Sequence, residues 1–184
     1  MSIETKYIEC QLATGHENTI LIALSELEDY VNGGHAEARV LWRELSFLRQ
    51  FIVNEFYVRG QSEGANVSNL WDMLTKTHLV AKKRPHRCRK MQVPYSFRRL
   101  ISLQSLTMDD CGLDNIPQSV IELRGLRWLS LKRNNIAQLP ANFNYHANMK
   151  VVDLRQNPIS AQFDLTDDLN WIYEVLPKDC KVLH

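Results

Sequence analysis

The most constraining feature of this sequence is a repeat with a period of 23 residues in its second half. Pro94, Pro117 and Pro140 are separated by this spacing. The apolar side chains fall into three columns with the same spacing: Leu103, Leu126 and Met149; Leu106, Leu129 and Val152; and Met108, Leu131 and Leu154. Because each unit of such a repeat contacts mainly its neighbours, every column is predicted to form a layer of one continuous core.

A polar column formed by Cys111, Asn134 and Asn157 keeps the same register. An asparagine in a turn can hydrogen-bond to backbone groups that have no partner in a strand ladder. The units read LQSLTMDDCGLDNIPQSVIELRG, LRWLSLKRNNIAQLPANFNYHAN and MKVVDLRQNPIS. They resemble leucine-rich repeats of the LxxLxLxxNxLxxLPxxxxxLxx type. The departures are Cys111 at the asparagine position, and Tyr145 and His146 near the last leucine of the pattern.

This resemblance covers about residues 86–160 and implies an α/β fold, a short right-handed leucine-rich-repeat solenoid with parallel strands on its concave face. Counting back one period from Cys111 reaches Cys88, which predicts a degenerate unit from about residue 80. Its strand positions would be Lys83 and Pro85, which suit a strand poorly, so it is interpreted as a partial or capping unit. We therefore expect repeats over residues 82–163, with full units starting at residues 103, 126 and 149.

Residues 1–81 are predicted to form a helical N-terminal bundle or cap of three amphipathic helices. Thr14-x-x-Glu17 matches a capping box, and residues 32–34 (Asn-Gly-Gly) end the first helix. A second helix is expected over about residues 36–59, and a third from near Asn66 or Ser68. Their apolar stripes are Ile20, Leu24, Leu27 and Val31; Leu41, Leu45, Leu48, Ile52 and Phe56, widened by Phe47, Phe51 and Tyr57; and Val67, Leu70, Trp71 and Leu74. The alternative is an independent module for partner binding or targeting.

Residues 164–184 are predicted to form a helical C-terminal cap. Thr166 is placed to cap a helix that carries Asp167 and Asp168 in its first turn. Leu169, Ile172, Tyr173 and Leu176 form one apolar stripe, and Pro177 ends the helix. The final residues 180–183 are expected to add an edge strand.

The strand residues that alternate with the inward leucines are predicted to face a protein partner. These candidate partner-binding residues are Ser105, Thr107, Asp109, Asp110, Trp128, Ser130, Lys132, Arg133, Val151, Asp153, Arg155 and Gln156. Trp128 and Arg133 are of the types that dominate binding energy at interfaces, and the alternating charge suits a polar, mixed-charge partner. The alternative is a solvated face whose charges pair within the chain and contribute little.

The sequence also bears on two other functional classes, a nucleic-acid adaptor and an enzyme. Residues 82–90 form a dense basic run, which would suit a nucleic-acid-associated adaptor, although solvated charge is the simpler interpretation because aromatic residues are not interleaved with it. No phosphate-binding, dinucleotide-binding, zinc-protease or serine-hydrolase motif is present. We therefore expect no enzyme activity and no cofactor. An enzyme with an unrecognised site in the helical N-terminal region, using the repeats to select substrate, remains the alternative.

The cysteines and the composition exclude several other classes. Cys10, Cys88, Cys111 and Cys180 form no CxxC pair, so we expect reduced, buried thiols and no metal site. The net charge of +1 gives no general attraction to nucleic acid, and no stretch is long and apolar enough for a membrane span. The N-terminus lacks an apolar signal core, which indicates a cytoplasmic protein or one secreted into a host cell without a cleavable signal peptide. The chain is similar in architecture and size to small bacterial leucine-rich-repeat effectors. That resemblance implies binding that masks or inhibits a partner, for example an enzyme.

Overall fold

The computed structural model describes residues 3–58, 65–82, 90–141, 143, 148–161, 175–177 and 179–184. They fall into two compact units. The helical unit comprises Met1–Lys76 with Arg99–Ser102, and the repeat unit comprises Thr77–Arg98 with Leu103–His184. The predicted boundaries at residues 81 and 163 and the capping roles of the two ends stay predictions.

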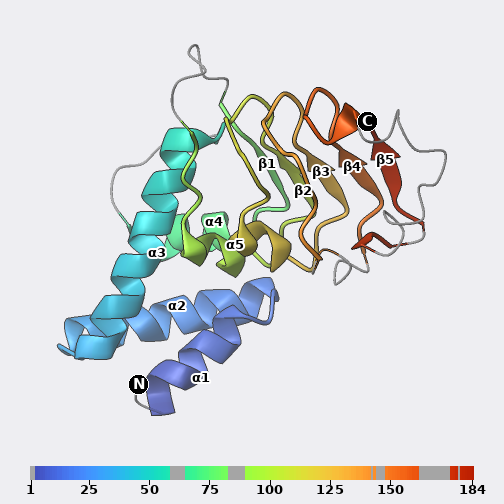
Figure 1. The fold of residues 1–184 in the computed structure, drawn as a ribbon. Coiled ribbons are helices and arrows are strands. Elements are labelled where there is room, and N and C mark those ends of the chain that lie inside the picture. Colours follow the sequence, from blue (N-terminus) through green and yellow to red (C-terminus); the bar gives the residue numbers. More distant parts are fainter. Residues whose placement is uncertain are drawn as a thin grey trace. The chain divides into compact units, whose positions relative to one another are not determined.

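Four helices build the helical unit (Figure 1). They are α1 (Ile3–Leu12), α2 (Glu17–Asn32), α3 (Ala36–Glu55) and α4 (Val67–Leu74). The predicted stripes supply the buried residues Ile20, Leu24 and Leu27 of α2 and Leu41, Leu45, Leu48 and Ile52 of α3. Apolar residues three and four apart share one face of a helix, so packing of these faces against one another excludes water from a common core.

The sequence prediction for this region needs three corrections. Residues 3–58 and 65–76 hold four helices rather than the three predicted, because α1 precedes the first predicted one. The capping box was also wrong: α2 begins at Glu17, and the Thr14 hydroxyl donates to the carbonyl of Gln11 at 2.9 Å instead. Gly15 adopts a φ of 74° between the two helices, a left-handed conformation that glycine allows at low cost. Phe47 and Tyr57 do not widen the buried stripe, since both are more than half exposed.

Arg99 ties residues 99–102 to the helical unit. Its guanidinium donates to both carboxylate oxygens of Glu44 on α3 at 2.9 and 3.0 Å, and to Glu9 on α1 at 2.8 Å. Burial lowers the pKa of this guanidinium, but the hydrogen bonds to Glu44 and Glu9 outweigh that effect, and the net pKa is raised. Such forked bonds fix a geometry as well as a charge.

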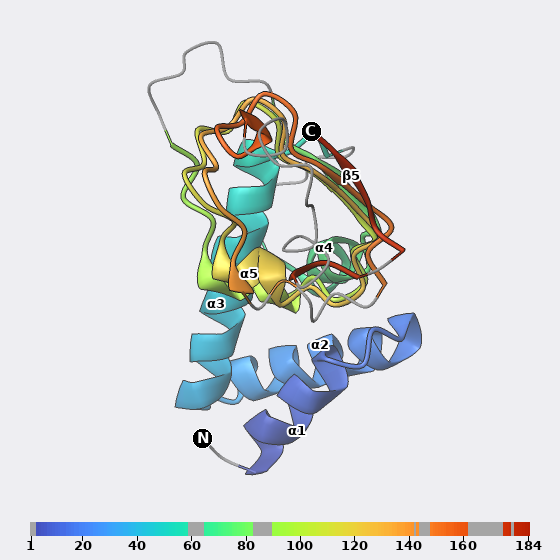
Figure 2. The same ribbon diagram turned by 45° about the vertical axis from the view of Figure 1, so that its right-hand side comes forward.

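The repeat unit is built around a five-stranded parallel sheet whose strands follow sequence order (Figure 1). The strands are β1 (His78–Val80), β2 (Ser105–Thr107), β3 (Trp128–Ser130), β4 (Val151–Asp153) and β5 (Lys181–Leu183). With the helices, this gives a mixed α/β, leucine-rich-repeat-like fold. Seen in Figure 2, the successive turns of this unit overlie one another.

The predicted columns lie in the interior. Leu106 pairs with Leu129 and Leu129 pairs with Val152 in adjacent strands, and all three side chains are fully buried. The outer columns, Leu103, Leu126 and Met149 and then Met108, Leu131 and Leu154, are also fully buried. Because the strands are only about 4.8 Å apart, residues in one column are in direct contact and form an apolar ladder.

The three prolines make the same turn in each unit. The carbonyls of Pro94, Pro117 and Pro140 accept from the amides three residues later, at 3.0, 2.9 and 3.0 Å. Those amides belong to Phe97, Val120 and Phe143, whose side chains are fully buried. The turns continue as a 3-10 helix, η1 (Tyr95–Arg99), and a short helix, α5 (Gln118–Ile121). Each proline therefore returns the chain along the side opposite the sheet while adding an apolar residue to the core.

The first strand begins earlier in the chain than the repeat period predicts. One period before Leu106 is Lys83, but the residue that pairs with Leu106 is Leu79 of β1. Since Pro94 keeps the register of Pro117, the additional residues lie between β1 and its proline turn. The strand positions Lys83 and Pro85 were therefore wrong. These two residues and most of the basic run fall within residues 83–89, outside the described part of the chain.

At the C-terminal end the predicted edge strand is confirmed. Val182 of β5 pairs with Val152 in parallel, and the amide of Lys181 donates to the carbonyl of Lys150 at 2.8 Å. Leu176 is buried, as its place in the predicted stripe implied, but residues 162–174, which hold most of the predicted C-terminal helix and its cap Thr166, lie outside the described residues. Cys111 and Cys180 are buried free thiols as expected, whereas Cys10 is exposed; Cys88 is not among the described residues.

Candidate functional site

The outward side of the parallel sheet carries two rows of side chains, which we call the sheet face. Parallel pairing in register places corresponding residues of each strand side by side. The first row is His78, Ser105, Trp128, Val151 and Lys181, and the second is Val80, Thr107, Ser130, Asp153 and Leu183. Side chains alternate across a strand, so these rows lie opposite the inward column of Leu79, Leu106, Leu129, Val152 and Val182.

Trp128 lies at the centre of the sheet face. It occupies the middle strand, with Ser105 on one side and Val151 on the other. Its side chain is 44% exposed, although Leu129, which follows it in the strand, is fully buried. A large aromatic side chain held on a packed strand loses little conformational entropy when a partner covers it. This geometry suits an anchor for binding.

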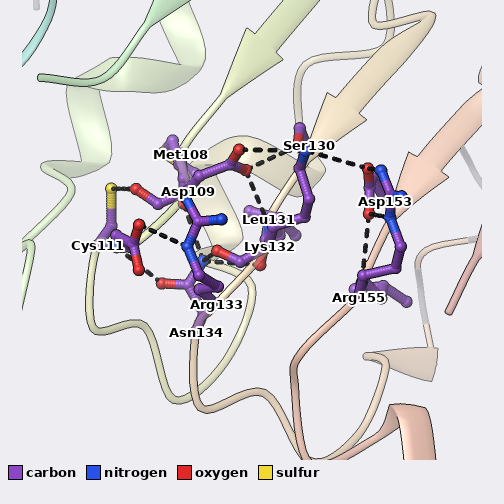
Figure 3. Close-up of polar contacts among 12 residues, drawn as sticks. Met108, Asp109, Cys111, Ser130, Leu131, Lys132, Arg133, Asn134, Asp153 and Arg155 are labelled. Carbon is purple, nitrogen blue, oxygen red and sulfur yellow. Dashed lines mark hydrogen bonds and ion pairs between the residues drawn. The ribbon is translucent and has the colours of Figure 1, made fainter. Parts of the chain in front are cut away.

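A polar network joins three strands at the carboxyl ends of the sheet (Figure 3). One carboxylate oxygen of Asp109 accepts from the Ser130 hydroxyl at 2.7 Å and from the Lys132 amide at 3.0 Å. The Lys132 ammonium lies 3.8 Å from the Asp109 carboxylate and 3.7 Å from the Asp153 carboxylate. The Arg155 guanidinium donates to both carboxylate oxygens of Asp153, at 3.0 and 2.8 Å. The charges alternate across the strands, so each carboxylate has a cation within the chain.

Ser130 and Asp153 are buried by this network rather than exposed to a partner. Their exposed fractions are 4% and 2%. Burial raises the pKa of the Asp153 carboxyl, but the hydrogen bonds and charge of Arg155, with the charge of Lys132, outweigh it and leave the pKa below its usual value. The charges in this half of the sheet face are therefore paired within the chain, and their assignment to a partner stays a prediction.

Asp153 is expected to make stability depend on pH in the acid range. Because its pKa is lower in the folded chain than in the unfolded chain, its contribution is complete above the unfolded pKa of about 4 and is lost as pH falls through the folded pKa. The difference in free energy of unfolding between the native chain and Asp153→Asn should shrink as pH is lowered from about 6 to about 3.

Arg155→Gln provides the matched comparison for that pH profile. Loss of the guanidinium raises the pKa of Asp153 in the folded chain toward its value in the unfolded chain, so the stability of this variant should fall less between about pH 6 and about pH 3 than that of the native chain. Urea titrations at several pH values measure both effects. A difference between the native chain and Asp153→Asn that stays constant over the range would contradict this role.

The three residues that follow the network adopt a left-handed backbone. Asp110, Arg133 and Gln156 recur with the period of the repeat and have φ values of 56°, 55° and 58°. This conformation costs a non-glycine residue roughly 1 kcal/mol, and it bends the chain out of each strand. The Arg133 guanidinium donates to Asp110 at 2.7 Å, so its charge is partly neutralised within the chain.

Asn134 holds the turns of two units together, as its column predicted. Its side-chain oxygen accepts from the amides of Cys111 and Leu113 at 3.0 and 3.1 Å. Its side-chain nitrogen donates to the carbonyls of Met108 and Leu131, both at 2.8 Å. Asn157 repeats the pattern one unit later, with Ile136, Leu131 and Leu154 as partners. These bonds fix the loops that border the sheet face.

One exposed row of this surface escaped the sequence analysis. Gln104, Arg127 and Lys150 precede β2, β3 and β4, recur with the period of the repeat, and are all exposed. The amide of Arg127 donates to the carbonyl of Gln104 and that of Lys150 to Arg127, each at 2.8 Å, so the residues lie side by side. The period itself was the available signal, but the position that precedes each strand had not been assigned to the surface.

A groove lies in the helical unit, between α1 and α2. It has a volume of about 700 Å³ and is lined by Glu4, Tyr7, Ile8, Glu26, Asp29, Tyr30 and His35. The rings of Tyr30 and His35 meet edge to face, with centroids 4.9 Å apart. Among the described residues lining this groove, no hydrogen bond joins a nucleophile to a base, the arrangement that covalent catalysis uses.

The Cys180 thiol is partly shielded from solvent, and this affects its ionisation. Burial raises the pKa of the Cys180 thiol to about 11, so this group is neutral, and not a nucleophilic thiolate, near pH 7. Within the described ranges, no three histidine, cysteine or acidic side chains gather in a way that could hold a metal ion. The same ranges contain no helix with the length and apolar character needed to span a membrane.

Comparison with solved structures gives a likeness in architecture. No protein-family model and no curated protein sequence matches the chain. Among solved structures, it is similar to a leucine-rich-repeat protein of Leptospira interrogans, with 22% sequence identity and a TM-score of 0.37. The match covers 50% of this chain and 28% of the Leptospira protein, so this chain spans only a small part of that protein's length. The leucine-rich-repeat-like assignment therefore rests on the stacked columns and the asparagine bonds of this chain itself.

Proposed function

We propose that this chain is a non-catalytic protein-binding module whose partner docks on the sheet face. The observation that carries the proposal is Trp128, a large aromatic side chain that is 44% exposed at the centre of a parallel sheet. The interior ladder of Leu106, Leu129 and Val152 and the Asn134 bonds hold the surrounding backbone in place. A rigid surface of this kind binds without a large ordering cost.

The size of the sheet face bears on how a partner contacts it. Five strands about 4.8 Å apart span roughly 19 Å, and the six steps from Gln104 to Asp110 span roughly 20 Å, a flat area of about 400 Å². A standard interface buries about 800 Å² on each partner. We therefore propose that the partner extends past the strands onto the neighbouring loops, with Trp128 near the middle of the contact.

The candidate residues divide into two groups in this proposal. Trp128 and Val151 supply apolar contact, while Arg133 and Arg155 present partly exposed guanidinium groups at the border. Ser130 and Asp153 act indirectly, because both are buried: Ser130 bonds to Asp109, and Asp153 pairs with Lys132 and Arg155. We further propose that the repeat unit winds as a right-handed solenoid with this face on its concave side. As the resemblance to bacterial effectors implies, occupation of the face would mask or inhibit a partner enzyme.

Trp128→Ala is expected to weaken partner binding by about 2–3 kcal/mol, the range of an interface hot spot. Removing an exposed ring should change the free energy of unfolding by less than about 1 kcal/mol. Tyr95→Ala is the matched control, since Tyr95 is 60% exposed in the same unit but lies on η1, away from the sheet face. Affinity capture from a native lysate identifies the partner, and calorimetry then measures its affinity for each variant.

The two variants distinguish specific docking on the sheet face from nonspecific binding to exposed aromatic side chains. A partner retained in stoichiometric amounts by the native chain and by Tyr95→Ala, but lost by Trp128→Ala, fits the proposal. Equal retention by all three proteins contradicts docking on the sheet face. If the chain converts a captured protein or small molecule to a modified product over many catalytic cycles, the protein is an enzyme and the proposal of a non-catalytic module is wrong.

A further inference from the structure

The amino-terminal border of the sheet face carries three cations on three adjacent strands. Arg127 precedes β3 and Lys150 precedes β4, and the amide of Lys150 donates to the carbonyl of Arg127 at 2.8 Å. Lys181 begins β5 beside Val151 and donates its amide to the carbonyl of Lys150, also at 2.8 Å. All three side chains are exposed. Arg127 and Lys150 immediately precede Trp128 and Val151 in the chain, and Lys181 pairs in register with Val151.

The charges on the sheet face are balanced at one end and unbalanced at the other. At the carboxyl ends of the strands, Lys132 and Arg155 offset Asp109 and Asp153. At the amino ends, no ion pair connects Arg127, Lys150 or Lys181 to a carboxylate anywhere in the described ranges. The surface therefore has an excess of positive charge confined to its amino-terminal border.

The nearby turns do not remove this excess. Arg124 is exposed in the turn before β3, and Asp179 is exposed in the turn before β5. Their opposite charges cancel in the net charge of the described residues at this border. The three cations therefore remain as the net charge of the described border residues, next to an exposed aromatic ring.

From this arrangement we infer that the amino-terminal half of the sheet face recognises an extended acidic segment of a protein. The inference rests on the proposed function, since it names the chemistry of the partner at the same surface. Carboxylates of the segment pair with Arg127, Lys150 and Lys181, and an apolar side chain of the segment packs on Trp128. The three cations span about 10 Å across the strands, and alternate side chains of an extended peptide are about 6.6 Å apart, so a short segment reaches all of them.

The same geometry favours a polypeptide over a nucleic acid. A phosphate backbone carries closely spaced negative charge and needs a continuous track of cations. Here the cations stop after three strands, and two carboxylates lie farther along the strands: Asp153 is three residues, or roughly 10 Å, beyond Lys150, and Asp109 is five residues, or roughly 16 Å, beyond Gln104. A protein segment can place carboxylates at one end and neutral or basic groups at the other, which matches this pattern.

The test uses the full chain and three fluorescein-labelled probes in an anisotropy titration. The first probe is a 12-residue peptide of alternating glutamate and serine with one central phenylalanine. The second has glutamine in place of every glutamate, and the third is a 12-nucleotide strand of thymidine. The native chain is expected to bind the glutamate peptide at least about tenfold more tightly than the glutamine peptide, and an increase in salt should reduce that difference.

Charge variants assign the effect to the three cations. Combined Arg127→Glu, Lys150→Glu and Lys181→Glu should weaken the glutamate peptide by about tenfold or more, and the corresponding glutamine substitutions should weaken it by an intermediate factor. The control combines Lys6→Glu, Arg39→Glu and Arg43→Glu, three exposed cations of the helical unit, and makes the same change in net charge. It should alter the affinity by less than about twofold.

The outcomes distinguish the inference from the proposed function. If Trp128→Ala weakens both peptides equally and charge reversal affects neither, docking on the sheet face stands and the preference for acidic segments is overturned. If neither variant affects binding, or if no peptide binds at up to about 1 mM, both are overturned. Tighter binding of the thymidine strand than of the glutamate peptide, abolished by charge reversal, would also overturn the inference and assign the border to nucleic acid.

Discussion

Asn134→Ala is expected to lower the free energy of unfolding of the repeat unit by about 3–5 kcal/mol, because each buried backbone group that loses its partner costs roughly 1–3 kcal/mol. The Asn134 side chain satisfies the amides of Cys111 and Leu113 and the carbonyls of Met108 and Leu131. The Leu131 carbonyl also accepts from the Asn157 side chain and keeps that partner, so the loss falls mainly on the other three groups. Water that enters the space left by the side chain can bond to some of these groups. The expected loss of unfolding free energy is therefore smaller than the sum of the costs of the separate groups.

The neighbouring asparagine provides a matched control. Asn135 is exposed, and its side chain donates to Asp114 at 3.0 Å. Asn135→Ala should therefore change the free energy of unfolding by less than about 0.5 kcal/mol. Urea denaturation followed by circular dichroism and tryptophan fluorescence measures both variants. Similar values for the two substitutions would show that the buried bonds of Asn134 do not hold the turns together.

Leu129→Ala is expected to cost about 3–4 kcal/mol, within the range for truncating a buried leucine. Its side chain lies between Leu106 and Val152 in the middle of the interior ladder and has no exposed surface. Truncation removes apolar contact from both neighbours and leaves a cavity that the adjacent strands cannot close without shifting their own hydrogen bonds. Thermal and urea denaturation of the variant measure the loss.

Leu183→Ala tests whether position in the sheet decides the effect. Leu183 lies on the last strand, β5, and is only partly buried on the sheet face. The same truncation there should cost less than about 1.5 kcal/mol, since less apolar area returns to water. An equal or smaller effect at Leu129 than at Leu183 is incompatible with a core that runs through Leu106, Leu129 and Val152.

The sheet and its interior could be predicted from the sequence because one period fixes both. Once Leu106, Leu129 and Val152 recur with that period, parallel stacking is the arrangement that buries all three, and Asn134 must then meet the turn of the preceding unit. The period cannot detect an insertion. The additional residues after β1 shifted the predicted first strand, although the turn at Pro94 kept its register.

The exposed site was harder to predict. The alternation of side chains along a strand shows to which side of the sheet each residue points, but not whether neighbouring side chains cover it. Ser130 and Asp153 do point outward, yet Asp109, Lys132 and Arg155 reach across the strands and cover them. Long side chains on neighbouring units decide such burial, and their conformations are not encoded in the repeat. The assignment of Trp128, Arg133 and the other candidate residues to a partner stays a prediction.

In the helical unit, local signals conflicted with one another. Thr14 and Glu17 have the spacing of a capping box, but Gly15 lies between them with a φ of 74° and redirects the chain. The Thr14 hydroxyl then bonds backward to Gln11. The hydrogen bonds of Arg99 with Glu44 and Glu9 join side chains from distant parts of the sequence, and periodicity does not predict such bonds.

Nuclear Overhauser effects between labelled methyl groups test the stacked sheet most directly. Strands about 4.8 Å apart put the methyl groups of Leu106 in contact with those of Leu129, and those of Leu129 in contact with those of Val152. Both cross-peaks should be strong, together with one from the Trp128 ring to the Val151 methyl groups, whereas Leu106 and Val152 should show none. Strong contact between Leu106 and Val152, or no contact of Leu129 with either, would contradict the stacked face on which partner binding depends.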